Sequence, residues 1–92
     1  METLLDPNNA LIYFDHFVYV KSELIRVTKE QYNNIVKSVK DPGIVVDANE
    51  GSKMKYYFKE IESNKVIVIG VKHENGIWKI WEYSENNSTI NP

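Results

Sequence analysis

Cysteine is absent from this chain of 92 residues. Disulfide bonds and thiolate metal sites are therefore excluded. No serine lies in a Gly-x-Ser-x-Gly elbow, and no spacing links a serine to a histidine and an acid. The four glycines are dispersed, so a glycine-rich phosphate loop is excluded as well. The sequence thus argues against nucleotide hydrolysis and against the common forms of nucleophilic catalysis.

Long apolar runs and an excess of basic residues are also lacking. No apolar run approaches the roughly 18 residues that a membrane span needs, and no basic-plus-apolar signal opens the chain. We therefore expect a soluble protein in the cytoplasm of a bacterial host, with no membrane partner. The net charge is −2 and the isoelectric point is near 5.6. Nonspecific nucleic-acid binding relies on clustered Lys and Arg, so this balance disfavours that class.

What the chain does contain is a series of three predicted strands between residues 53 and 83. Residues 66–71 are apolar and mostly β-branched, which predicts a central strand with neighbours at both edges and cover on both faces. Asn75 and Gly76 precede the aromatic segment 77–83, and this pair favours the positive φ angles of a type I′ hairpin turn. The three segments predict an antiparallel β-meander.

The first strand of this meander alternates in character, and alternate residues of a strand point to opposite faces. One set is apolar and is expected to face the core: Met54, Tyr56 and Phe58. The other set contains lysines and is expected to face solvent: Lys55, Tyr57 and Lys59.

Residues 28–40 predict an amphipathic helix. Thr28 and Gln31 occupy the two positions of a capping box. An apolar stripe follows at helical spacing: Tyr32, Ile35, Val36 and Val39. The helix is expected to end at the Asp-Pro-Gly sequence 41–43, because proline bars the preceding residue from a helix and glycine frees the backbone.

The remaining segments give weaker signals. Residues 1–10 show no periodicity and predict an irregular lead-in. Residues 11–20 favour either one strand bent near Asp15 and His16 or two short strands. Residues 21–27 fit either a single helical turn or an extended arm. A short strand is expected over 44–46, a loop over 47–52, and a polar, turn-rich tail from Ser84 onward.

These elements predict one α+β domain spanning residues 1–92, with a core from about 11 to 84 and a flexible tail over 85–92. One main amphipathic helix packs on a roughly four-stranded antiparallel sheet, and an extra strand region lies at the N-terminus.

Metal and cofactor chemistry has little basis in the sequence. The two histidines, His16 and His73, lie on different predicted elements, and adjacent residues such as Asp15 and His16 point to opposite faces of a strand. We therefore expect no metal and no cofactor.

Metal-independent RNA cleavage needs less, because the ribose hydroxyl is the nucleophile and the protein supplies only a base, an acid and a cation. The residues that could do this are Arg26, Lys72, His73 and Tyr83. This remains the alternative to a binding function.

Exposed aromatic residues are the main indication of a binding function, since Tyr and Trp are common binding hot spots. A strand with a core on one face should leave some of them exposed on the other. The candidate binding residues are Tyr57, Lys55, Lys59, Trp78 and Trp81.

From about Val18 to Tyr83, the order of elements is an apolar strand, a helix ending in Lys-Asp-Pro-Gly-Ile-Val-Val, an aromatic-basic strand, an apolar strand and a closing strand, Trp-Lys-Ile-Trp-Glu-Tyr-Ser. This order resembles the phage-associated domains of the barnase, EndoU, colicin and RelE-like nuclease superfamily. The resemblance implies a helix on an antiparallel sheet and an RNA-cleaving ancestry. Active members carry histidines in the helical segment, whereas residues 22–40 have none, so the resemblance implies a degenerate, non-catalytic relative.

The expected function is therefore that of a small phage or mobile-element protein that binds a bacterial protein and modulates or inhibits it, for example in a defence system. RNA remains a second possible partner. A homodimer formed through an exposed edge strand is compatible with either function.

Overall fold

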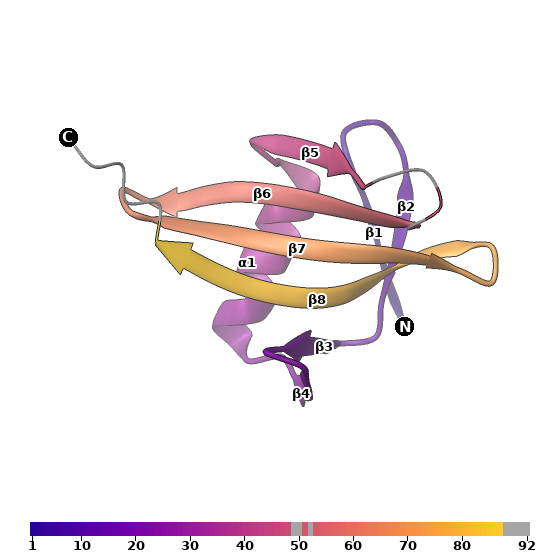
Figure 1. The fold of residues 1–92 in the computed structure, drawn as a ribbon, viewed down its shortest axis with the longest axis horizontal. Coiled ribbons are helices and arrows are strands. Elements are labelled where there is room, and N and C mark those ends of the chain that lie inside the picture. Colours follow the sequence, from indigo (N-terminus) through magenta and orange to yellow (C-terminus); the bar gives the residue numbers. More distant parts are fainter. Residues whose placement is uncertain (49–50, 52, 88–92) are drawn as a thin grey trace.

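A computed structural model describes residues 1–48, 51 and 53–87. These residues form one helix, α1 (Lys29–Lys40), and eight strands in a single sheet (Figure 1). The strands are β1 (Glu2–Leu5), β2 (Leu11–Phe14), β3 (Phe17–Val20), β4 (Glu23–Arg26), β5 (Ile44–Asp47), β6 (Met54–Glu62), β7 (Lys65–Glu74) and β8 (Ile77–Asn87). The α+β class is confirmed.

The predicted meander is present as β6, β7 and β8, with β7 in the centre. Asn75 and Gly76 have φ angles of 53° and 81°, as a type I′ turn requires. The β7–β8 register shifts by one residue, because Gly70 pairs with Glu82 while Val71 pairs with Ile80. Trp81 is therefore the extra residue of a β-bulge.

The sheet is larger than the predicted four strands. Its main path is β1-β2-β8-β7-β6-β5, and the β3–β4 hairpin joins it beside β8. Both β2 and β3 pair with β8 in parallel, through Ile12 with Trp78 and Tyr19 with Glu82. The prediction of an antiparallel sheet of about four strands was thus wrong, because local patterns show strands but not their long-range pairing.

The N-terminal segments account for the difference. The lead-in contains β1, and its Leu4 is only 6% exposed, so the prediction of an irregular start was wrong. Two apolar residues in a row are too few to show a period. Residues 11–20 do divide into two short strands, with His16 at a φ of 71° between them. Residues 21–27 form an extended arm, β4, rather than a helical turn.

The helix has the predicted bounds. Thr28 accepts a hydrogen bond from the Gln31 amide at 3.1 Å, and the Gln31 side chain accepts one from the Thr28 amide at 2.8 Å. The helix ends at Lys40, before Asp41. Both bonds satisfy amides that the first helical turn leaves without partners.

The C-terminal part of the chain also departs from expectation. β8 continues to Asn87, four residues into the predicted tail. The rest of that tail, 88–92, lies outside the described residues, as do 49, 50 and 52 of the predicted loop.

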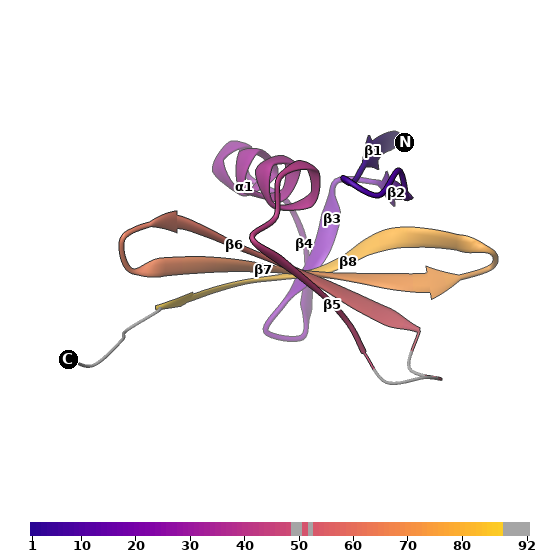
Figure 2. The same cartoon turned by 90° about the horizontal axis from the view of Figure 1, so that it is seen from above.

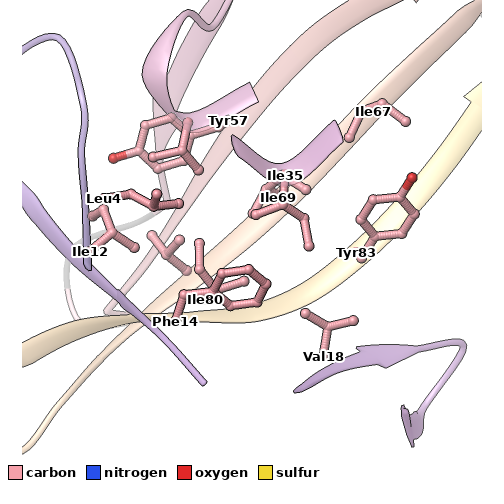
Figure 3. Close-up of a cluster of buried hydrophobic side chains, with 12 residues drawn as sticks. Leu4, Ile12, Phe14, Val18, Ile35, Tyr57, Ile67, Ile69, Ile80 and Tyr83 are labelled. Atoms are coloured by element: carbon pink, nitrogen blue, oxygen red, sulfur yellow. The ribbon is translucent and has the colours of Figure 1, made fainter. Parts of the chain in front are cut away.

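The core lies between α1 and one face of the sheet, and β1 and β2 lie on the same side as α1 (Figure 2). Figure 3 shows this cluster of buried side chains, which come from α1, from β1 and β2, and from the central strands. Among them are Ile12, Phe14, Ile35, Ile69 and Tyr57. The opposite face carries no helix in the part of the chain that the structure describes. No helix among the described residues is long and apolar enough to cross a membrane.

Candidate functional site

The two faces of β7 differ in their surroundings. Ile67, Ile69 and Val71 are fully buried toward α1. Val66 and Val68 point the other way and are only partly buried. The prediction that this strand is covered on both faces was therefore wrong, and we call the side away from α1 the uncovered face.

The strand β6 has the opposite orientation from the one predicted. Tyr57 is fully buried toward α1, whereas Tyr56 and Phe58 lie on the uncovered face, where they pair with Gly70 and Val68 of β7. The hydroxyl of Tyr57 donates a hydrogen bond of 2.7 Å to Asp6, which is itself 4% exposed. Tyr57 is thus a core residue and not an exposed binding residue.

Burial and the bond to Asp6 explain why tyrosine occupies this core position. Burial raises the pKa of Tyr57, and the hydrogen bond to the Asp6 carboxylate raises that pKa further. The hydroxyl therefore stays protonated and acts as a donor. Asp6 also accepts hydrogen bonds from the amides of Asn8 and Ala10, at 2.9 and 2.8 Å.

Three other candidate binding residues lie on the α1 side of the sheet. The ammonium of Lys55 lies 4.5 Å from the ring centre of Trp78, which packs against the core. The ammonium of Lys59 lies 3.0 Å from the Asp41 carboxylate. Lys55 and Lys59 run past the core to partners at its edge, an aromatic ring for Lys55 and a carboxylate for Lys59, as long amphipathic side chains do.

The four residues proposed for RNA cleavage are not brought together. Lys72 lies on the uncovered face, 4.4 Å from the ring centre of Trp81. His73 lies on the opposite face, with its ring 4.9 Å from that of Trp78. Tyr83 is buried beneath α1, and Arg26 lies on β4 against the ring of Phe17.

Tyr83 is also chemically unsuited to proton transfer. Its hydroxyl donates to Glu85 at 2.5 Å and accepts from Asn34 of α1 at 3.0 Å. Burial raises the pKa of Tyr83 well above the usual tyrosine value, and the hydrogen bond to Glu85 raises it further. Both contacts are those of a structural residue.

The uncovered face gathers aromatic side chains from several strands. The rings of Tyr19 and Trp81 lie 5.3 Å apart, with Lys72 against Trp81. Tyr56 and Phe58 continue the same face on β6. We call these four aromatic residues and Val68 the aromatic face. Ile80 and Tyr83 both face the core although they are three residues apart, because the bulge adds one residue between them. Trp81 and Glu82, which lie between them, therefore both face away from the core.

A groove of about 520 Å³ opens on this face, between Tyr19, Val68 and Trp81. Its wall is the tip of the β3–β4 hairpin at Lys21 and Ser22, which projects on the side away from α1 (Figure 2). The groove exists because β3 pairs with β8 at a single position and then diverges from it.

Glu82 lies at the floor of this groove. Its side chain crosses Gly70, and a Cβ atom at position 70 would stand 2.6 Å from Glu82 Cγ. Asp15, by contrast, binds Lys79 at 2.8 Å and accepts from the Phe17 amide at 3.0 Å. Within 1–48, 51 and 53–87, Glu82 has neither an ion pair nor a hydrogen bond. The aromatic face therefore holds a partly buried carboxylate that no described side chain neutralises.

A second polar cluster lies on the other side of the molecule and was missed from the sequence. Glu2 accepts from the Tyr32 hydroxyl at 2.7 Å and contacts Nε2 of His16 at 3.1 Å. The rings of His16, Phe14 and Tyr32 pack against one another, with centroids 4.8 to 5.9 Å apart. These contacts fasten β1 to α1 and to the β2–β3 bend. No group of three or more metal-ligating side chains occurs in the described part of the chain.

Comparison with protein-family models gave no match, and comparisons with curated proteins and with solved structures gave no significant match.

Proposed function

We propose that this chain is a non-catalytic binding protein that docks a bacterial protein on its aromatic face and thereby modulates or inhibits it. The observation that carries the proposal combines three features: a sheet face that no described helix covers (Figure 2), the Tyr19–Trp81 ring pair, and a Glu82 carboxylate without a partner among the described residues. Tyr and Trp bury large rigid surfaces at low entropic cost, and they dominate protein interfaces.

The charges of the face favour a protein over RNA as the partner. Lys72 is shared between Trp81 and Glu74, whose carboxylate lies 3.7 Å from its ammonium. Glu82 would repel the phosphates of RNA on the aromatic face. A Lys or Arg side chain would instead form an ion pair with the Glu82 carboxylate in a partly desolvated setting. The partner is therefore a protein that presents a basic residue among apolar ones.

The resemblance to phage-associated domains supports a bacterial target, including a defence factor. The ribonuclease alternative gains no support from the geometry, since Lys72 and His73 point to opposite faces and Tyr83 is buried.

The proposal is tested with tagged protein and bacterial lysate, followed by titration of the purified captured protein. Wild type is compared with Trp81→Ala, Glu82→Lys and a charge-matched control, Glu62→Lys, at an exposed position near the β6–β7 turn. A partner held by wild type and by the control, but lost by both face variants, supports the proposal. Capture that Glu82→Lys leaves unchanged would contradict it.

A second arm uses bacterial RNA in EDTA. Cleavage of the RNA by wild type, abolished in an Arg26→Ala or His73→Ala variant, would overturn the non-catalytic function.

A further inference from the structure

The sheet ends at β5, and this edge is unusually apolar. All four residues of β5 are exposed, with Ile44 at 61%, Val45 at 37% and Val46 at 43%. β5 contains no lysine, proline or bulge, which are the features that usually protect an edge strand from pairing. The other two edge strands have the same length but carry charges, Glu2 on β1 and Glu23 and Arg26 on β4.

The outer edge of β5 has peptide groups that can form hydrogen bonds with another strand. After the last residue of β5, the Ala48 amide donates to the Met54 carbonyl at 3.0 Å, in the register that pairs Asp47 with Lys55. Before its first residue, the Gly43 amide donates to the Phe58 carbonyl at 2.8 Å, although Phe58 pairs with Ile44, so this bond lies outside the regular alternation. Alternate residues of an antiparallel strand bond to opposite sides. With Ala48 bonded inward, the peptide groups of Val45 and Asp47 point outward, and no described strand lies beside them.

We propose that β5 pairs antiparallel with β5 of a second copy of this chain, about a two-fold axis at Val46. In this register Val45 of each copy pairs with Asp47 of the other, and both outward-facing residues of each strand take part in the ladder. The two Val46 side chains then face each other as a non-hydrogen-bonded pair, for which β-branched residues are favourable.

A second copy fits this edge because the contact is self-complementary. An isologous interface needs a surface that matches itself, and an Ile-Val-Val strand without a positive charge meets that condition. The antiparallel arrangement brings Asp47, at the end of one β5, toward the beginning of the other, where Lys59 follows Phe58 on β6. Asp47 has no ion pair among the described residues, and Lys59 of the second copy, which binds its own Asp41 at 3.0 Å, would be shared between the two carboxylates.

This pairing would join the two sheets through β5 and leave Tyr19, Trp81 and Glu82 open, since β6 and β7 separate β5 from β8 in the sheet order. Tyr56 and Phe58 pair with Val46 and Ile44, so this part of the aromatic face would lie beside the dimer contact. A variant at Trp81 or Glu82 should therefore leave the dimer intact.

Because the chain has no cysteine, a single introduced thiol reports one position only. The two Val46 positions would lie within the Cα separation that a disulfide spans. We expect the Val46→Cys variant to form an oxidised dimer about tenfold faster or more than Thr3→Cys, its control on the exposed side of β1, because pairing raises the effective thiol concentration.

Sedimentation of wild type and of Val46→Lys at increasing protein concentration completes the test. Wild type should show a concentration-dependent dimer, and Val46→Lys should weaken it about tenfold or more, since two like charges would face each other. The circular dichroism and melting temperature of the isolated variant should match those of monomeric wild type. A wild type that stays monomeric, a dimer that tolerates Val46→Lys, or equal cross-linking at the two thiol positions would each overturn the proposal.

Discussion

The two faces of this sheet are built from the same strands but differ in whether their polar side chains have hydrogen-bond partners. On the α1 side, the buried hydroxyl of Tyr57 is bound to Asp6, and that of Tyr83 is bound to Asn34 and Glu85. On the uncovered face, Glu82 lies across Gly70 with no described partner. A buried polar group without a partner costs free energy, so the first face is arranged for stability.

The difference shows where each kind of change should act. A substitution on the α1 side should change the free energy of unfolding and affect binding only through it. A substitution on the aromatic face should change binding and leave unfolding nearly unaltered. Adjacent residues of a single strand can separate the two effects, because they differ mainly in the side of the sheet to which they point.

The largest contrast should come from two carboxylates. Asp6→Ala removes the acceptor for the Tyr57 hydroxyl and for two backbone amides, which should lower the free energy of unfolding by about 3 kcal/mol. Glu82→Ala removes a carboxylate without a described partner and should change it by less than about 0.5 kcal/mol. Urea unfolding of both variants measures this difference, and equal losses would show that Glu82 is structural.

A second contrast compares two valines of β7. Val71 is fully buried, so Val71→Ala should cost about 2 kcal/mol through lost transfer free energy and a residual cavity. Val68 lies on the uncovered face, where Val68→Ala should cost less than about 1 kcal/mol. Thermal unfolding of the two variants provides the measurement. A Val68 variant as unstable as the Val71 variant would mean that the uncovered face is covered in the isolated protein.

The acid sensitivity of the fold should depend on Asp6. Burial raises the pKa of Asp6, but the Tyr57 hydroxyl and the Ala10 and Asn8 amides lower it, and the net pKa is below the ordinary value of 3.8. A depressed folded-state pKa contributes stability that is present above pH 3.8 and is lost as the pH falls through the lower, folded value. Wild type should therefore lose more stability than Asp6→Asn below that pH. Parallel acid titrations followed by circular dichroism would show the difference, and superimposable profiles would contradict it.

The sequence predicted the helix and the meander well because each carries its own local signals. The Thr28 capping box, the Asp-Pro-Gly stop and the Asn75–Gly76 turn act through a few neighbouring residues. The four N-terminal strands do not have such signals. Parallel pairing of Ile12 and Tyr19 with β8 depends on contacts more than 60 residues away in the chain.

The candidate site was harder to predict than the fold. Alternation along β6 defines two sets of residues but not which set is buried, and the lysines beside Tyr57 gave the wrong choice. Their stems line the edge of the core while their ammonium groups reach Trp78 and Asp41. The exposure of Trp81 depends on the bulge opposite Gly70. The position of the Glu82 side chain depends on the absence of a side chain at that glycine. Neither feature is visible in a hydrophobic pattern.

The last prediction concerns one buried side chain on the α1 side that lacks the hydrogen-bond partner its neighbours have. The Ser38 hydroxyl is fully buried on α1 and has no hydrogen-bond partner among the residues that the structure describes. Ser38→Ala removes this unsatisfied group and places a better helix former at the position, which should raise the free energy of unfolding by about 1 kcal/mol. Ser63→Ala, in the exposed β6–β7 turn, is the matched control and should stay within about 0.5 kcal/mol of wild type. A destabilised Ser38→Ala variant would mean that the hydroxyl has a partner in solution, and that every buried polar group on this face is satisfied.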